Sequence, residues 1–281
     1  MSFTCVDSHV HFWDQGTFSY PWLVDVPAIA GRQTPSELRE QTAAAASPSQ
    51  MVFVECGAPW LDEVRWVEQL AAREPRIAGI VARCAINAGA ATTAAIEELQ
   101  RHALVRGVRH NIQDELDPRF CVARDFLAGV RQLGAVDLSF DICCRHHQLP
   151  AVIELVRQCP DTRFVLDHCG KPDIREGRVD PWRAHIAELA ALPNVDCKLS
   201  GLITEADHTA WTVDQLRPFV DHVLATFGSS RLLYGGDWPV VNLAATYARW
   251  LGTARQLVSH LSAAAQDAIF AGNARRVYRL S

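Results

Sequence analysis

The chain has 281 residues, of which 49% are hydrophobic and 21% are charged, so it is long enough to bury one large core. Its 27 basic and 32 acidic residues give a net charge of −5, which argues against nucleic acid or an anionic membrane surface as a partner. The N-terminus lacks the regions of a secretory signal, and no apolar run is long enough to cross a bilayer. We therefore expect a cytoplasmic protein.

Eight short apolar runs alternate with longer helical patterns along the chain, and we predict that each run is a β-strand. In chain order they are Thr4–Val10, Met51–Cys56, Ile77–Ile86, Val105–Asn111, Asp137–Cys143, Arg163–His168, Asn194–Ser200 and Arg231–Gly235. The nine cysteines include no CxxC pair, and most lie in these runs, which predicts free, buried thiols in a reducing compartment.

Capping residues mark several helix starts between the strands. Thr34-Pro35-Ser36-Glu37 is a capping box, and Asp180-Pro181 and Thr212–Gln215 each open a further helix. Eight strand–helix units in this length predict a (β/α)8 TIM barrel as a single domain over 1–281. The alternative, a doubly wound sheet, is disfavoured because no glycine-rich GxGxxG turn follows a strand.

In a barrel of this kind the strand ends meet at one mouth, where the chemistry takes place. The first run ends with His9 and His11, which strand alternation places on one face. Two imidazoles on a rigid face provide half of a divalent-metal site. The alternative is a pair of hydrogen-bonded interior histidines.

Further polar side chains stand at other strand ends. They are Glu55 in the second run, His168 and Lys171 at the sixth, and Asp237 after two glycines at the eighth. Buried Glu55 needs a partner such as a metal or a cation. Together they predict a mixed site for one divalent metal, zinc or manganese, with these candidate ligands: His9, His11, Glu55, His168 and Asp237.

Four motifs occur in order from Cys5 to Leu280: HxH at 9–11, LDHxGKP at 166–172, GGDWP at 235–239 and GNAxRxYxL at 272–280. In these motifs the chain resembles the amidohydrolase superfamily, and more narrowly its amidohydrolase-2 branch of lactonases. The resemblance implies a hydrolase in which Asp237 is the general base. His9, His11 and His168 would then line the metal or the polarised carbonyl.

The chain departs from the binuclear pattern of that superfamily, because it has no lysine on strand four and carries Asp141 rather than histidine on strand five. These departures indicate one metal at most. Some lactonases of this branch are understood to use arginine, lysine and histidine to polarise the carbonyl without a metal. The resemblance therefore leaves metal-assisted and metal-independent mechanisms open.

Other residues near the strand ends are candidates for catalysis or substrate binding. Of the consecutive Arg109 and His110, a regular strand points only one inward, and we favour His110 as a catalytic donor, with Asp237 and His168. For Lys198 the alternative is an ion pair with a carboxylate of a neighbouring strand. The predicted substrate-binding residues are Trp22, Arg109, Asp141, Lys171, Lys198 and Trp238.

The mixture of acidic and basic residues around the predicted mouth favours a neutral, hydroxyl-rich lactone, because an anionic one would need several arginines. With the resemblance, the expected reaction is hydrolysis of a deoxysugar aldonolactone such as L-fucono-lactone or L-rhamnono-lactone. The alternatives are an anionic lactone of the pyrone-dicarboxylate or muconolactone type, a metal-dependent decarboxylase, and a barrel that binds without catalysis. The oligomeric state is left open.

Overall fold

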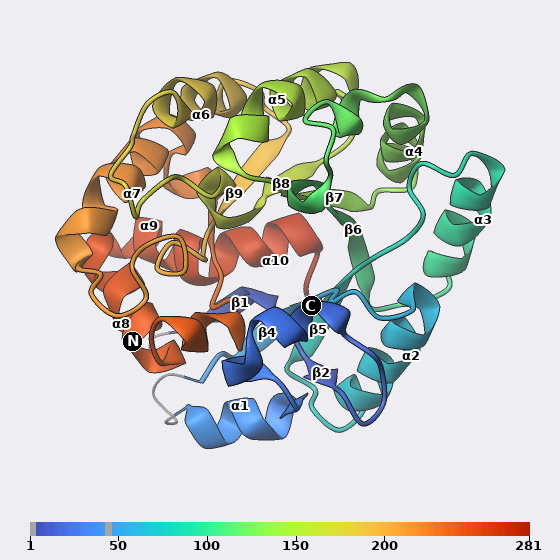
Figure 1. The fold of residues 1–281 in the computed structure, drawn as a ribbon, viewed down its shortest axis with the longest axis horizontal. Coiled ribbons are helices and arrows are strands. Elements are labelled where there is room, and N and C mark those ends of the chain that lie inside the picture. Colours follow the sequence, from blue (N-terminus) through green and yellow to red (C-terminus); the bar gives the residue numbers. More distant parts are fainter. Residues whose placement is uncertain (1–3, 43–46) are drawn as a thin grey trace.

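Eight parallel strands form a barrel in the computed structural model, which describes residues 4–42 and 47–281 (Figure 1). In barrel order they are β1 (Val6–Val10), β4 (Gln50–Val54), β5 (Ile77–Ala82), β6 (Val105–Asn111), β7 (Ser139–Cys143), β8 (Phe164–Leu166), β9 (Val195–Leu199) and β10 (Leu232–Tyr234). Just beyond β10, Trp238 bridges to Val10 of β1. The predicted TIM barrel is confirmed, and each predicted run overlaps one strand.

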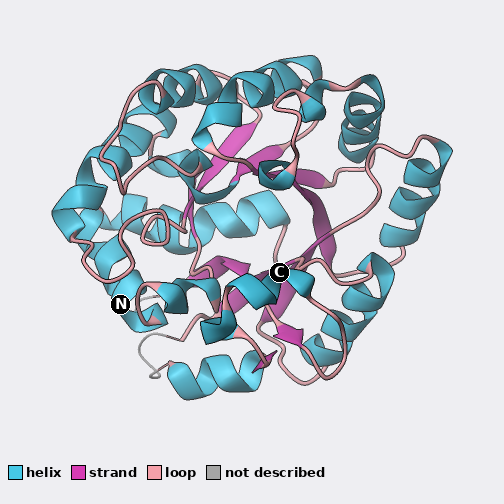
Figure 2. Ribbon diagram, in the orientation of Figure 1, coloured by secondary structure: helices cyan, strands magenta, loops and turns pink. Residues whose placement is uncertain are grey.

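Most helices surround the strands on the outside of the barrel, and α10 lies across one end of it (Figure 2). They are α1 (Pro35–Gln41), α2 (Trp60–Ala71), α3 (Ala90–Leu99), α4 (Arg124–Ala135), α5 (Leu149–Gln158), α6 (Trp182–Ala190), α7 (Val213–Phe227), α8 (Tyr247–Leu257), α9 (Ala263–Asp267) and α10 (Asn273–Tyr278). A capping box opens α1 as predicted, α7 begins after Thr212 as predicted and also has a capping box, and α6 starts directly after Pro181. A short antiparallel pair, β2 (Trp13–Asp14) and β3 (Arg32–Gln33), lies in the loop after β1.

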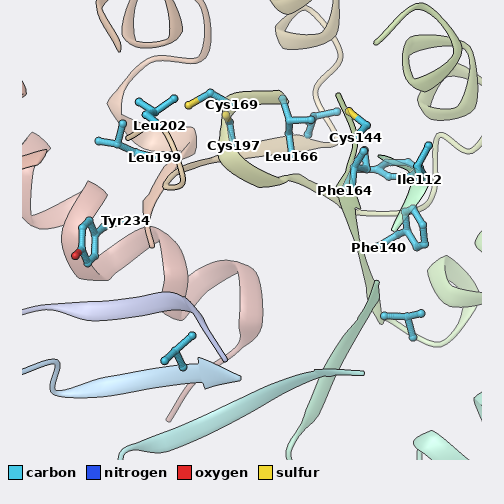
Figure 3. Packing of buried hydrophobic residues seen from close by; sticks show 14 of the residues in the cluster. Ile112, Phe140, Cys144, Phe164, Leu166, Cys169, Cys197, Leu199, Leu202 and Tyr234 are labelled. Atoms are coloured by element: carbon cyan, nitrogen blue, oxygen red, sulfur yellow. The ribbon is translucent and has the colours of Figure 1, made fainter. Parts of the chain in front are cut away.

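Strand alternation divides the core into two layers. Phe140, Phe164 and Leu199 belong to the large cluster packed between the strands and the surrounding helices (Figure 3). A smaller cluster fills the barrel with side chains from five strands, and α10 contributes to it across the centre of Figure 1. Its strand residues are Val6, Val52, Val54, Val81, Val165 and Leu233. Because α10 closes this end, the chemistry is confined to the other end.

All nine cysteines are free and buried, as predicted. Across the described residues there is no helix with the length and apolar character that a membrane crossing requires.

Candidate active site

A cavity of about 480 Å³ opens at the carboxyl ends of the strands. Seven of the eight strands, or the residues directly after them, contribute to its wall. The lining residues are His11, Pro21, Trp22, Glu55, Cys56, Gly57, Arg83, Arg109, Asn111, Gln113, Asp114, Cys143, His168, Lys171, Thr204, Asp237 and Val240. The structure therefore has a cavity where the sequence predicts the mouth of the barrel.

His11, directly after β1, lines this cavity, and His9 of β1 lies beside His11 and is fully buried. Their Nε2 atoms lie 3.1 Å apart. Nδ1 of His11 lies 2.8 Å from the Val54 carbonyl oxygen, which can only accept, so this nitrogen carries the ring proton of neutral His11. Nε2 of His11 therefore presents a lone pair, either to a metal ion or to an N–H of His9.

The segment after β8 has an unusual backbone that aims two side chains at the cavity. His168 and Lys171 have φ values of 55° and 46°, in the left-handed region that non-glycine residues rarely occupy. Nδ1 of His168 lies 2.8 Å from Oγ of Ser200, which anchors the ring. A Cβ on Gly201 would collide with that ring, so glycine is required there. This strained turn ends the strand earlier than predicted.

Asp237 also has left-handed backbone, with φ 55°, in the turn after β10. Its N–H donates to the carbonyl of His9 at 2.8 Å, and its Oδ1 lies 3.5 Å from Nε2 of His11. The N–H of Gly236 donates to Asp7, and a Cβ there would collide with Asp7 and Tyr247. The predicted close backbone approach therefore occurs at Gly236, and it holds Asp237 against the histidine pair.

The electrostatics of the cavity keep Asp237 ionised. Burial raises the pKa of this carboxyl, but His168, His11 and Lys171 outweigh it and lower the pKa below its usual value. Burial also lowers the pKa of His168 well below its usual range. Burial lowers the pKa of Lys171, but neighbours that include Glu205 and Asp237 raise it overall. The cavity therefore holds a carboxylate, an imidazole and an ammonium group.

Some of these side chains form a set that fits a divalent metal. One ligand atom from each of His9, His168 and Asp237 lies within 4.8 Å of the others, and His11 adjoins them. Imidazole nitrogens and a carboxylate are the donors that zinc takes in catalytic sites. Two nitrogens bound to one tetrahedral zinc ion lie about 3.3 Å apart, close to the separation within the histidine pair. The chemistry of the donor set therefore fits zinc.

A fully buried ionic layer lies around the inner side of His9. The Lys198 ammonium lies 2.6 Å from Oδ2 of Asp141, 2.9 Å from Oδ1 of Asp167 and 3.2 Å from Nδ1 of His9. Tyr278 of α10 donates to Oδ2 of Asp141 at 2.6 Å. Burial lowers the pKa of Lys198, but Asp141 and Asp167 outweigh it and the pKa is raised, so Lys198 is a permanent internal cation.

Three of the predicted substrate-binding residues do not line the cavity. Asp141 and Lys198 are fully buried in the ionic layer and pair with each other, so their predicted contact with substrate is corrected. Trp238 is also fully buried, and its Nε1 donates to Gln41 while the ring packs on Phe12. Its ring turns outward because Asp237 reverses the chain just before it.

The prediction that His110 faces the site is corrected in favour of Arg109. Strand β6 stays in regular register with β7 as far as Asn111, so Arg109 and Asn111 face inward and His110 faces outward. Nε2 of His110 lies 2.7 Å from Glu115, and its ring stacks on Phe120.

Glu55 lies at the cavity, but it is outside the two groups of possible metal ligands found among the described residues. Nε of Arg109 donates to its Oε1 at 2.8 Å, so the partner of this carboxylate is a cation. Trp22 and Lys171 line the cavity as predicted, and Trp22 is held there because its Nε1 donates to the Cys56 carbonyl at 2.9 Å.

Several residues of the site were not predicted from the sequence. Arg83, Asn111 and Cys143 line the cavity, and Asp167 bridges Lys198 and His9. Each stands at or directly after a strand end, which is the signal that could have identified them. The strand ends also carry many other residues, and alternation selects among them only where the strand stays regular.

Comparison with known proteins places this architecture in a family. Residues 6–280 match the family model described as Amidohydrolase. The chain is 38% identical over 288 residues to an L-fucono-1,5-lactonase of Burkholderia multivorans, covering 98% of this chain and 96% of that one. It is 34% identical to an L-fucono-1,5-lactonase of Burkholderia ambifaria, covering 98% and 95%.

A crystal structure of an amidohydrolase from Burkholderia multivorans with bound zinc superimposes with a TM-score of 0.89 at 35% identity, covering 99% of this chain and 100% of that one. The agreement therefore extends over the whole barrel and not only over the strand-end motifs. The resemblance inferred from four motifs is confirmed, and the chain belongs to the amidohydrolase family.

Proposed function

We propose that the protein hydrolyses a neutral sugar-acid lactone, L-fucono-1,5-lactone or a related deoxysugar aldonolactone, to the free acid. The observation that carries the proposal is the buried carboxylate of Asp237, which lies at the base of a sugar-sized cavity beside His11 and His168. The name of the Burkholderia relatives supports the choice of substrate class.

The charges around the cavity favour a neutral substrate. Arg109 is paired with Glu55, and Nζ of Lys171 lies 3.6 Å from Glu205. Arg83 has no carboxylate at ion-pair distance within residues 4–42 and 47–281, so a substrate anion would meet one uncompensated arginine. Asn111, Gln113 and Thr204 offer both donors and acceptors, which suit hydroxyl groups.

Trp22 is proposed to bind the apolar face of the sugar ring. Its side chain lines the mouth and stays 36% exposed, so one ring face is free to stack on C–H groups of a ligand.

Asp237 would act as general base and then as general acid. Its carboxylate accepts a proton from the water that attacks the lactone carbonyl, and the new C–O bond converts that carbonyl to a tetrahedral oxyanion. Lys171 stabilises the negative charge on this oxygen. When the ring C–O bond breaks, Asp237 returns the proton to the departing alkoxide, which yields the hydroxy acid and the original carboxylate.

A divalent metal, zinc before manganese, would be held by His9, His11, His168 and Asp237. When bound it would supply Lewis acidity and lower the pKa of water. Glu55 is not retained as a ligand, because it pairs with Arg109. Polarisation by Lys171 does not depend on the metal, so both mechanisms predict the same role for Asp237.

The test is a pH-indicator assay of the purified protein against deoxysugar lactones, pyrone-dicarboxylate and muconolactones, with parallel detection of carbon dioxide from aromatic carboxylates. Each substrate is measured as isolated, after chelation and after zinc is restored. We expect acid release from L-fucono-1,5-lactone. Turnover restricted to anionic lactones, or carbon dioxide release alone, would overturn the proposal.

A further inference from the structure

Nδ1 of His9 has two competing neighbours in the buried ionic layer. The ammonium Nζ of Lys198 lies 3.2 Å away and the carboxylate Oδ1 of Asp167 lies 3.3 Å away. An ammonium group only donates hydrogen bonds and a carboxylate only accepts them. A neutral ring can satisfy only one of the two, and the choice decides which ring nitrogen carries the proton.

In the first arrangement, Lys198 donates to Nδ1 of His9. The Lys198 ammonium then donates to Asp141 and His9, and it lies at ion-pair distance, 2.9 Å, from Asp167. The proton of His9 sits on Nε2 and points to Nε2 of His11, 3.1 Å away, which carries a lone pair. Both ring nitrogens of His9 have a partner in this arrangement, but His9 offers no lone pair to the cavity.

In the second arrangement, Nδ1–H of His9 donates to Asp167. Neither oxygen of Asp167 receives a hydrogen bond of good geometry, although Lys198 and Arg109 lie at ion-pair distance, so this carboxylate has capacity to accept. Nε2 of His9 is then bare, and Nη1 of Arg109 lies 3.5 Å from it. A carboxylate behind a metal-bound histidine is the usual support for such a ligand.

We propose that Lys198 and Asp167 compete for Nδ1 of His9 and thereby determine whether His9 is available as a metal ligand. Without metal, the shorter contacts favour the arrangement in which Lys198 donates. Metal binding moves the ring proton from Nε2 to Nδ1, so the ring stays neutral and no net proton is released. Lys198 and Asp167 are thus positioning residues with opposite effects. This inference rests on the proposed metal position and not on the proposed substrate.

The direct test is nitrogen NMR of the protein labelled with ¹⁵N in its histidine rings, with His9 assigned by the signal lost in His9→Gln. We expect a protonated Nε2 in the metal-free protein and a protonated Nδ1 after zinc is added. A proton on Nδ1 in both states, or no change at His9 on saturation with zinc, would overturn the proposal. So would a failure of zinc to bind.

Variants test the competition through zinc affinity measured by calorimetry. Lys198→Met removes the competing donor, and we expect about tenfold tighter binding, whereas Asp167→Asn weakens binding about tenfold. Tyr278→Phe is the matched control, because it removes a bond to Asp141 without touching His9, and its affinity should stay within twofold of wild type. Equal changes in Lys198→Met and Asp167→Asn would contradict the proposal.

Circular dichroism establishes whether each variant is folded. If a variant does not fold, the NMR measurement on the wild-type protein tests the proposal without it. The readouts are independent of lactone turnover. A protein without lactonase activity that still exchanges its His9 tautomer on binding zinc would refute the proposed function and support this inference.

Discussion

At the mouth of the barrel, Lys171 and Asp237 line a cavity, whereas further inside Lys198 and Asp141 form a 2.6 Å ion pair without solvent exposure. Each pair consists of a lysine and an aspartate. Lys171 and Asp237 follow the ends of β8 and β10, whereas Lys198 and Asp141 lie on β9 and β7 with their side chains facing inward. Only the pair at the mouth can meet a substrate. The comparison teaches that strand alternation predicts which face a side chain occupies but not its depth along the barrel axis.

The position of each lysine–aspartate pair along the barrel axis determines its role. The inner pair is enclosed by Asp167, His9 and Tyr278, so its charges are compensated and serve to orient neighbours. The pair at the mouth is built on left-handed backbone at Lys171 and Asp237, which costs roughly 1–3 kcal/mol per residue. Strain at the mouth and full pairing further inside are consistent with chemistry at the first place and support at the second.

The largest expected effect on stability is at the inner pair. Asp141→Asn leaves Lys198 with one carboxylate and deprives Tyr278 of its charged acceptor, so we expect a loss of about 3 kcal/mol in the free energy of unfolding. Denaturant unfolding measures it. The folded variant should keep kcat within a fewfold of wild type, and a stable but inactive variant would place Asp141 in the chemistry after all.

At the mouth, Lys171→Met should reduce kcat about a hundredfold with little change in stability, because it removes one donor to the oxyanion. Steady-state kinetics with L-fucono-1,5-lactone provides the measurement. His110→Gln is the control, since His110 faces Glu115 outside the cavity, and its kcat should stay near that of wild type. The reverse order of the two effects would restore the original preference for His110.

The smallest effect is expected just before β5, remote from the cavity, where Arg76 and Arg39 bind Glu74. The hydrogen bond from Arg76 lowers the pKa of Glu74 to about 2, although burial opposes the shift. Because the pKa of Glu74 is lowered in the folded state, this carboxylate stabilises the fold above pH 4.5, its ordinary pKa. The stabilisation is lost as the pH falls towards 2. Glu74→Gln should cost about 1 kcal/mol at pH 7, discounted for the exposed arginines. Denaturant unfolding should show a smaller difference in the free energy of unfolding between wild type and Glu74→Gln at pH 3 than at pH 7.

The barrel was predictable because each strand lies in a short apolar run and several helix starts carry local capping chemistry, as at Thr34 and Thr212. The site was predictable where a residue directly follows a strand, as for His11 and Glu55. Trp238 could not be placed, because its direction depends on the left-handed turn at Asp237. The partners of Lys198 come from three other strand segments and α10, and no local pattern contains those distances.

The most direct test of the account compares wild type and Asp237→Asn for acid release from L-fucono-1,5-lactone, with thermal unfolding measured on the same samples. The substitution keeps the shape of the side chain but removes the base, so we predict a loss of about a thousandfold in kcat with little change in melting temperature. A folded Asp237→Asn protein with near-normal turnover would contradict the central role of this carboxylate.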